Sequence, residues 1–148
     1  MPTRPPALPR EVTEVLAAAP RRVLHVDDNA MSLRLLAQML ERLPGVRVSS
    51  LSDPLQAVLL APSLQPDLIL LDIRMEPIDG FEVLARLRAS AALVHVPVVA
   101  VTAEAAPAEL LRMRQTGFDR VLPFPLDLVQ LLDTVAALLD TCRSAAAA

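Results

Sequence analysis

The segment Asp67-Leu68-Ile69-Leu70-Leu71-Asp72-Ile73-Arg74-Met75, residues 67–75, places an unbroken apolar run directly before a carboxylate. Four consecutive apolar residues, Leu68 to Leu71, are typical of a strand that is buried on both faces of a parallel sheet. Polar side chains that follow such a strand lie at its carboxyl end, where open parallel sheets bind ligands. The segment therefore predicts a central strand and marks Asp72 as a candidate functional residue.

Apolar runs and helical segments alternate on both sides of this strand. Further strands are predicted at residues 23–26, 46–51, 96–101 and 120–122, and helices at about 30–43, 54–61, 80–89, 107–117 and 126–139. Asn29 and Asp53 stand where helix N-caps are expected, and Pro54 follows Asp53 as a first helical residue. Five strands alternating with five helices predict an α/β protein with a doubly wound parallel sheet and helices on both faces.

Three carboxylates and one hydroxyl follow the predicted strands. Asp27 and Asp28 come directly after the first strand, Asp72 after the third and Thr102 after the fourth. Because the carboxyl ends of parallel strands meet at one edge, we expect the carboxylates to converge in a shallow pocket. Carboxylates this close repel one another unless a cation lies between them, and oxygen ligands on a hard divalent ion describe Mg²⁺. A metal there offsets charge on an incoming phosphoryl group and leaves one carboxylate free to attack phosphorus.

Four segments, taken in this order, resemble the receiver domains of bacterial response regulators. They are Val26-Asp27-Asp28-Asn29, Leu70-Leu71-Asp72-Ile73-Arg74-Met75, Ile78-Asp79-Gly80-Phe81 and Val99-Ala100-Val101-Thr102-Ala103. The resemblance covers about residues 21–140 and implies a flavodoxin-like sheet of strand order 2-1-3-4-5. It also implies Mg²⁺-dependent phosphotransfer from a histidine kinase or a phosphotransfer protein to Asp72. The chain would then be a phospho-acceptor rather than an enzyme acting on other substrates.

The same resemblance implies roles for the residues of the acidic pocket. Asp27 and Asp28 would hold Mg²⁺, one directly and the other through water. Asp72 would be both a metal ligand and the nucleophile. The backbone carbonyl of Arg74 would be the third protein ligand.

Three neighbouring positions are expected to modulate the reaction. By the resemblance, the Thr102 hydroxyl would donate a hydrogen bond to a phosphoryl oxygen, and Glu104 lies where the family tunes dephosphorylation. The family's Met-Pro after the acceptor is replaced by Met75-Glu76. Glu76 adds an acid that could bind metal or interfere with the approach of a phosphoryl group.

The sequence departs from the family at the fifth strand. The family pattern is an aromatic residue, two further residues and then Lys-Pro; aligned on Pro125, Phe124 occupies the lysine position and Val121 the switch-aromatic position. The chain contains no lysine at all, and Phe124 cannot pair with a phosphoryl group. Arg74 is a candidate source of the missing positive charge.

Two interpretations of the function stay open. In one, the domain accepts phosphate with altered output, and the acidic triad and Thr102 favour this interpretation. In the other, it is a pseudo-receiver that acts by contact or dimerisation alone.

Composition and charge argue against other classes of function. A net charge of -3, a pI near 5.3 and 2% aromatic residues do not suit a nucleic-acid surface. No apolar run reaches the roughly 18 residues of a membrane span, and the single Cys142 fits a reducing cytoplasm.

The lack of a phosphate-binding loop after the first strand argues against a flavin carrier. Arg74 stands where an aspartate-nucleophile hydrolase needs a second aspartate. His25 and His95 lack a second ligand at useful spacing and are predicted to be structural.

The two ends of the chain differ from the predicted domain. We expect a Pro-rich extension at residues 1–20, with a possible helix at 11–19, then the receiver-like domain at 21–140 and a flexible tail at 141–148. The extension would suit a linker if the chain were the receiver piece of a hybrid histidine kinase. The last helix has a broad apolar face, which predicts self-association or contact with a downstream protein through the fourth and fifth helices.

Overall fold

The predicted strands form one five-stranded parallel sheet. The structure is a computed structural model that describes residues 20–103 and 106–147, with only the backbone of 141–147. The strands are β1 (Arg21–Val26), β2 (Val46–Leu51), β3 (Leu68–Leu71), β4 (Val98–Thr102) and β5 (Arg120–Pro123). Their order in the sheet is β2-β1-β3-β4-β5, so the predicted flavodoxin-like topology is confirmed.

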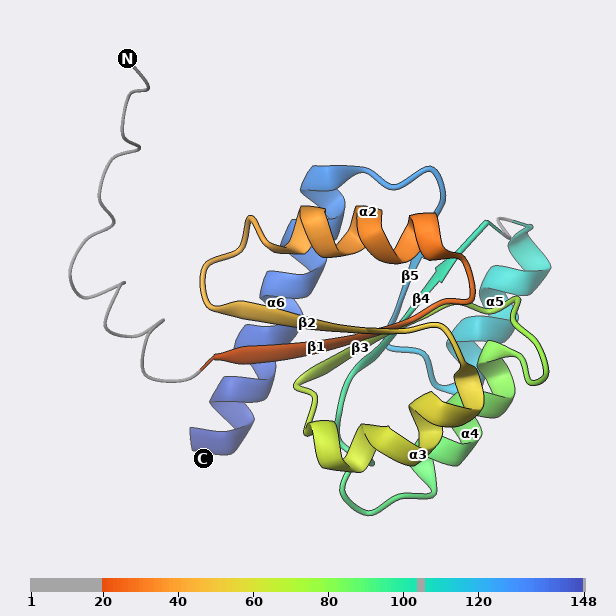
Figure 1. Ribbon diagram of the computed structural model, residues 1–148, viewed down its shortest axis with the longest axis horizontal. Coiled ribbons are helices and arrows are strands. Elements are labelled where there is room, and N and C mark those ends of the chain that lie inside the picture. The colour runs from red at the N-terminus through yellow and green to blue at the C-terminus, as the bar shows by residue number, and fades with distance from the viewer. Residues whose placement is uncertain (1–19, 104–105, 148) are drawn as a thin grey trace.

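Helices cover both faces of this sheet (Figure 1). They are α2 (Ala30–Leu40), α3 (Pro54–Leu64), α4 (Gly80–Arg88), α5 (Pro107–Thr116) and α6 (Leu128–Ala147). Helices α2 and α6 lie on one face, and α3, α4 and α5 lie on the other (Figure 1). In this doubly wound arrangement the helices cover the two faces of the sheet, and the carboxyl ends of the strands stay uncovered at one edge, where such sheets bind ligands.

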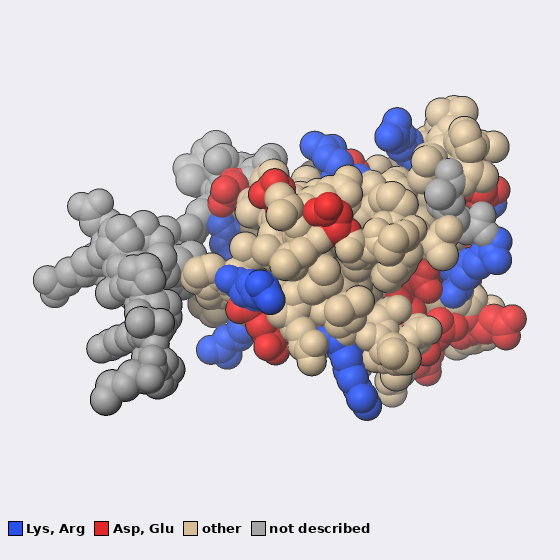
Figure 2. Space-filling model, turned by 90° about the horizontal axis from the view of Figure 1, so that it is seen from above, with Lys and Arg blue, Asp and Glu red and all other residues tan. Residues whose placement is uncertain are grey.

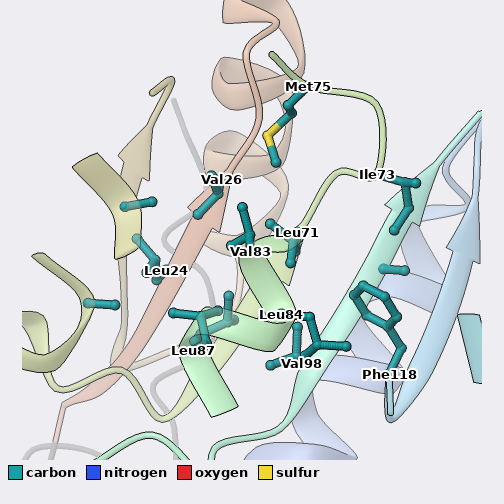
Figure 3. Close-up of a cluster of buried hydrophobic side chains, with 14 of the residues drawn as sticks. Leu24, Val26, Leu71, Ile73, Met75, Val83, Leu84, Leu87, Val98 and Phe118 are labelled. Atoms are coloured by element: carbon teal, nitrogen blue, oxygen red, sulfur yellow. The ribbon is translucent and has the colours of Figure 1, made fainter. Parts of the chain in front are cut away.

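The central strand β3 supplies side chains to two cores. Leu68 and Leu70 belong to the cluster beneath α2 and α6, whereas Ile69 and Leu71 belong to the cluster beneath α3, α4 and α5, part of which is shown in Figure 3. All four side chains are fully buried. The continuous apolar run is therefore explained by burial on both faces, and each of these side chains contributes about 1.5–3 kcal/mol of transfer free energy.

Most element boundaries follow local rules of capping and chain breaking. The Asn29 side chain accepts hydrogen bonds from the backbone N–H groups of Met31 and Ser32 at 2.9 and 3.1 Å, and Asp53 caps α3 in the same way, as predicted. The predicted start of the fourth strand at residue 96 was two residues early. Strand β4 begins at Val98 because Pro97 has no N–H group to donate to the ladder.

Several helix ends differ from the prediction. Helix α2 ends at Leu40 rather than Leu43, and α3 continues past Ala61 to Leu64 although Pro62 lies within its last turn. Helix α6 begins at Leu128 and runs to Ala147 rather than stopping near Leu139. Within the described part of the chain, no helix combines the length and apolar character needed to cross a membrane. The possible helix at 11–19, Glu104 and the Cys142 side chain lie outside the described residues.

Candidate functional site

Three carboxylates meet where two neighbouring strands end. Asp27 and Asp28 follow β1 and Asp72 follows β3, and these strands are paired in register with Val26 opposite Leu71. One carboxylate oxygen from each aspartate lies within 4.8 Å of the others. Asp27 is 2% exposed, whereas Asp72 is half-buried and Asp28 is exposed. The predicted convergence is confirmed, and the cluster has one buried and one open side.

The backbone holds the two less exposed carboxylates in place. The Asn29 N–H group donates to Asp27 Oδ1 at 2.9 Å, and the Ile73 N–H group donates to Asp72 Oδ1 at 2.8 Å. The Asp72 N–H group donates to the Val26 carbonyl at 3.0 Å and so continues the ladder between the strands. Because both aspartates follow directly where a strand ends, the sheet fixes the distance between their backbones, and the two N–H groups orient their carboxylates.

Gly80 brings the start of α4 against the loop that follows Asp72. Its N–H group donates to the Ile73 carbonyl at 2.8 Å. A Cβ atom at this position would lie 2.4 Å from the Asp72 carbonyl oxygen and 2.8 Å from Ile73 Cα. Only glycine permits this approach, which gives a physical reason for the Asp79-Gly80 pair in the motif.

Burial and mutual repulsion disfavour full ionisation of the cluster. Burial, followed by the negative charge of Asp27, raises the pKa of Asp72 to about 7, although backbone N–H groups of Ile73 and Arg74 counter part of the shift. Burial also raises the pKa of Asp27, and the charge of Asp28 adds to this. At neutral pH the cluster therefore favours either a retained proton or a bound cation. Three carboxylates without nitrogen or sulfur ligands fit Mg²⁺.

A cavity of about 350 Å³ opens at the cluster. It is lined by Asp27, Asp28, Asn29, Ser32, Asp72, Arg74, Ala103 and Phe124. Among these lining residues Arg74 is the only basic one. Thr102 is buried at the end of β4. It lies beside the wall of this cavity, because the next residue, Ala103, lines the cavity and the Thr102 carbonyl accepts the N–H group of Phe124, another lining residue, at 2.9 Å.

A second, larger cavity of about 610 Å³ adjoins the first, with Asp28 and Arg74 on the wall of both. Its other lining residues are Ile73, Met75, Glu76, Asp79, Phe81, Glu109 and Arg112. The Arg112 guanidinium carbon lies 4.0 Å from the centroid of the Phe81 ring, and that ring meets Phe118 edge to face. Glu76, which we predicted near the acidic pocket, lines this second cavity. Sequence reasoning missed Arg112, because no short motif joins it to Phe81.

The remaining predicted positions lie around the fifth strand. Val121 is half-buried and packs on the core beneath α3, α4 and α5, opposite Ala100 of β4. Phe124 packs partly on the other core and partly lines the acidic cavity. Pro125 is exposed and follows a cis peptide bond. Glu104 cannot be placed, because it lies outside the described residues.

His25 lies below the acidic cluster, inside β1. It is fully buried, and within the described structure neither ring nitrogen has a hydrogen-bond partner. Its Nε2 atom lies 3.9 Å from Asp27 Oδ2, which is too long for a hydrogen bond. Burial lowers the pKa of His25 to about 4, so the ring is neutral at physiological pH.

Charges of both signs surround the site. Figure 2 shows acidic side chains crowding the end of the molecule at which the strands finish, with basic side chains beside them.

The sequence model of the response regulator receiver domain matches residues 23–136. The chain belongs to the response regulator receiver family.

Several signalling proteins are similar to this chain over most of its length. The polar-differentiation response regulator DivK of Brucella anthropi is 32% identical over 120 residues, which cover 81% of this chain and 97% of DivK. The receiver domain of the sensor histidine kinase PA1611 of Pseudomonas aeruginosa is 30% identical with a TM-score of 0.75, and covers 82% of this chain and 99% of its own. That structure has a magnesium ion coordinated in its active site cleft. The chemotaxis protein CheY4 of Vibrio cholerae is 25% identical with a TM-score of 0.74, covering 81% and 99% of the two chains. The chain is thus a receiver domain of two-component signalling, a class that partners histidine kinases.

Proposed function

We propose that this receiver domain accepts a phosphoryl group on Asp72 from a histidine kinase or a phosphotransfer protein and signals through protein contacts. The observation that carries the proposal is the convergence of the Asp27, Asp28 and Asp72 carboxylates within 4.8 Å at the end of two paired strands. Asp27 and Asp28 would hold Mg²⁺ together with Asp72 and the backbone carbonyl of Arg74. The magnesium-bearing receiver of PA1611 supports this assignment.

The transfer itself is a displacement at phosphorus. A carboxylate oxygen of Asp72 attacks the phosphorus of a phosphohistidine, an oxygen–phosphorus bond forms, and the nitrogen–phosphorus bond breaks with its electron pair left on the imidazole. Ile73 fixes one Asp72 oxygen through its N–H group and so limits rotation of the nucleophile. The Thr102 hydroxyl would donate to a phosphoryl oxygen. Mg²⁺, when bound, neutralises charge on the phosphoryl oxygens.

Protonation of Asp72 makes the reaction depend on the metal. With the pKa of Asp72 near 7, a large share of this carboxyl is protonated at neutral pH when no cation is bound, and a protonated acid is a poor nucleophile. A cation next to the cluster favours the ionised form. We therefore expect phosphorylation without Mg²⁺ to be weak at pH 7 and to rise with pH.

Downstream contacts are proposed on α5 and α6. Leu111 on α5 is 54% exposed and Val129 on α6 is 66% exposed, so each helix presents apolar surface. These side chains would serve self-association or the binding of a downstream protein. Val121 and Phe124, which we assign to altered switch positions, lie on and next to the strand between these helices.

A second candidate function is a pseudo-receiver that works by contact alone. Phe124 lines the acidic cavity, and the chain has no lysine to place there. A phenyl ring cannot neutralise a phosphoryl group, so this observation favours the alternative. The three carboxylates favour the first proposal, because their mutual repulsion has no benefit in a contact module.

Intact-mass spectrometry tests the choice. The native chain is incubated with acetyl phosphate with and without Mg²⁺, beside Asp72→Asn and the matched control Asp79→Asn. Asp79 is an exposed N-cap that accepts the Glu82 N–H group at 2.9 Å, and Asn caps equally well. We expect a gain of one phosphoryl mass in the native chain and in Asp79→Asn, only with Mg²⁺, and none in Asp72→Asn. No gain in the native chain, together with no Mg²⁺ binding by titration, would favour the pseudo-receiver.

A further inference from the structure

His25 occupies a position in β1 where an apolar side chain would be expected. Side chains alternate along a strand, so His25 shares the face of Val23, which packs in the core beneath α2 and α6. The imidazole is fully buried, and within the described structure neither Nδ1 nor Nε2 has a hydrogen-bond partner. An unpartnered polar group in a core lowers stability, whereas a leucine or valine at this position would not. The imidazole therefore calls for a role other than filling the core.

The imidazole meets the acidic cluster at Asp27. Alternation places Asp27 on the same face two residues later, and His25 Nε2 lies 3.9 Å from Asp27 Oδ2. The other oxygen, Oδ1, accepts the Asn29 N–H group at 2.9 Å, so Oδ2 is the oxygen that faces the imidazole. The gap exceeds the upper limit of an N–H···O hydrogen bond by about 0.7 Å. A small rotation of either side chain closes it.

The neutral imidazole has one N–H group to donate. Burial lowers the pKa of His25 to about 4, so at neutral pH the ring carries a single proton, on Nδ1 or on Nε2. A proton on Nε2 turns a donor toward Asp27 Oδ2, whereas a proton on Nδ1 turns a lone pair toward a carboxylate and leaves the N–H group buried without an acceptor. The Nε2–H form is therefore favoured. Carboxylates that bind a metal are commonly oriented by hydrogen bonds from residues behind them, which is the place His25 occupies.

We propose that His25 is a positioning residue that donates its Nε2–H group to Asp27 Oδ2 and holds this carboxylate in the orientation that binds Mg²⁺. The proposal rests on the metal site of the function proposed above. Asp27 is then held from two sides, by the Asn29 N–H group on Oδ1 and by His25 on Oδ2. The imidazole stays neutral and contacts neither the metal nor the phosphoryl group. Its effect is on the affinity of the cluster for Mg²⁺, and on phosphorylation only through that affinity.

Mg²⁺ titration at pH 8 compares His25→Leu and His25→Gln with the native chain. Leucine keeps the apolar bulk and removes the donor, whereas the glutamine amide can place an N–H group close to the position of Nε2. We expect the Kd for Mg²⁺ to rise by about tenfold in His25→Leu, as is usual when a residue that orients a metal ligand is lost. His25→Gln should recover most of the native affinity. His95→Gln, at the other histidine of the chain, which is exposed, should bind Mg²⁺ like the native chain.

Nitrogen-15 spectra of the imidazole test the donor directly and need no substitution at position 25. In His95→Gln the only imidazole is that of His25, so its two nitrogens are assigned without ambiguity. We expect Nε2 to carry the proton with and without Mg²⁺. The Nε2 proton resonance should move downfield when Mg²⁺ binds, because the hydrogen bond to Asp27 shortens.

The outcomes separate the role of His25 from the proposed function. Weak Mg²⁺ binding by His25→Leu that His25→Gln restores, with an Nε2 proton that responds to Mg²⁺, supports the positioning role. The role is overturned by a His25→Leu that binds as tightly as the native chain, by a His25→Gln that binds no more tightly than His25→Leu, or by an Nε2 atom that carries no proton or whose proton does not respond. Mg²⁺ binding by the native chain then still stands. If the variants at position 25 do not fold, the spectra alone decide. A native chain that binds no Mg²⁺ overturns the metal site and the role of His25 together.

Discussion

Replacing Asp72 with Asn should stabilise the metal-free fold even though it removes the proposed acceptor. The two side chains have the same shape, and the amide oxygen can still accept the Ile73 N–H group that Asp72 Oδ1 accepts at 2.8 Å. What disappears is a negative charge held close to Asp27 and Asp28. The substitution therefore isolates the electrostatic cost of the cluster from its packing.

The size of the effect follows from the Asp72 pKa. Folding raises this pKa from 3.8 to about 7, so folding favours the protonated acid. The corresponding stability is fully present below pH 3.8 and is lost as the pH rises through about 7. Three pKa units correspond to about 4 kcal/mol, and because the side chain is only half-buried, solvent screening reduces this to about 2 kcal/mol at pH 8.

Urea unfolding at pH 5 and pH 8, each with chelator and with saturating Mg²⁺, measures this difference. In chelator at pH 8 we expect Asp72→Asn to be more stable than the native chain by about 2 kcal/mol, and at pH 5 the gap should shrink. Saturating Mg²⁺ should reverse the order, because the native chain binds the ion more tightly. Asp79→Asn serves as a control that removes an exposed carboxyl group outside the cluster. An Asp72→Asn variant that is less stable than the native chain at pH 8 in chelator would refute the electrostatic reasoning.

Two further substitutions test the surroundings of the cluster, and a third serves as a comparison. The pKa of His25 falls from 6.5 to about 4 on folding, so stability is lost as the pH drops from 6.5 through 4, by up to about 3 kcal/mol. His25→Leu should remove this loss of stability at acid pH, measured as the fall of the melting temperature between pH 6.5 and pH 4. An unchanged fall in the variant would show that another group causes it. Gly80→Ala should cost more than about 2 kcal/mol in urea unfolding, since its Cβ would lie 2.4 Å from the Asp72 carbonyl oxygen. Gly117→Ala, where only the positive φ of 111° opposes a side chain, should cost about 1–2 kcal/mol, and equal losses at the two sites would contradict the close approach.

Sequence patterns predicted the sheet because its rules are local. Continuous apolar runs gave the central strands, and side-chain caps at Asn29 and Asp53 gave the helix starts to the residue. The strand order alone was enough to predict that Asp27 and Asp72 lie close together, because they follow strands that are adjacent in the sheet. These features depend on neighbours in sequence or on one topological rule, which a single sequence contains.

Features that depend on packing between distant elements were not predictable. The contact between Arg112 of α5 and Phe81 of α4 joins helices separated by a strand and two loops. Likewise, the sequence indicated that His25 is structural, but not that both ring nitrogens lack a partner within the described structure. The prediction also misplaced the ends of α2 and α3, which lie at Leu40 and Leu64, because the final turn of a helix depends on how the next loop packs.

The cost of the acidic cluster bears on the choice between the two proposed functions. The backbones of Asp27 and Asp72 are held side by side by a ladder that includes the hydrogen bond from Asp72 N–H to the Val26 carbonyl, and one oxygen of each carboxylate is held by a backbone N–H group. Relief has to come from a proton or from a cation. Mg²⁺ at a hundred times its Kd stabilises the fold by about 2.7 kcal/mol, which is close to the cost of about 2 kcal/mol calculated for the ionised Asp72. A module that works only by contact would be more stable with Asn at position 72. The presence of a third carboxylate at that cost therefore supports a domain in which metal binding and phosphoryl transfer are used.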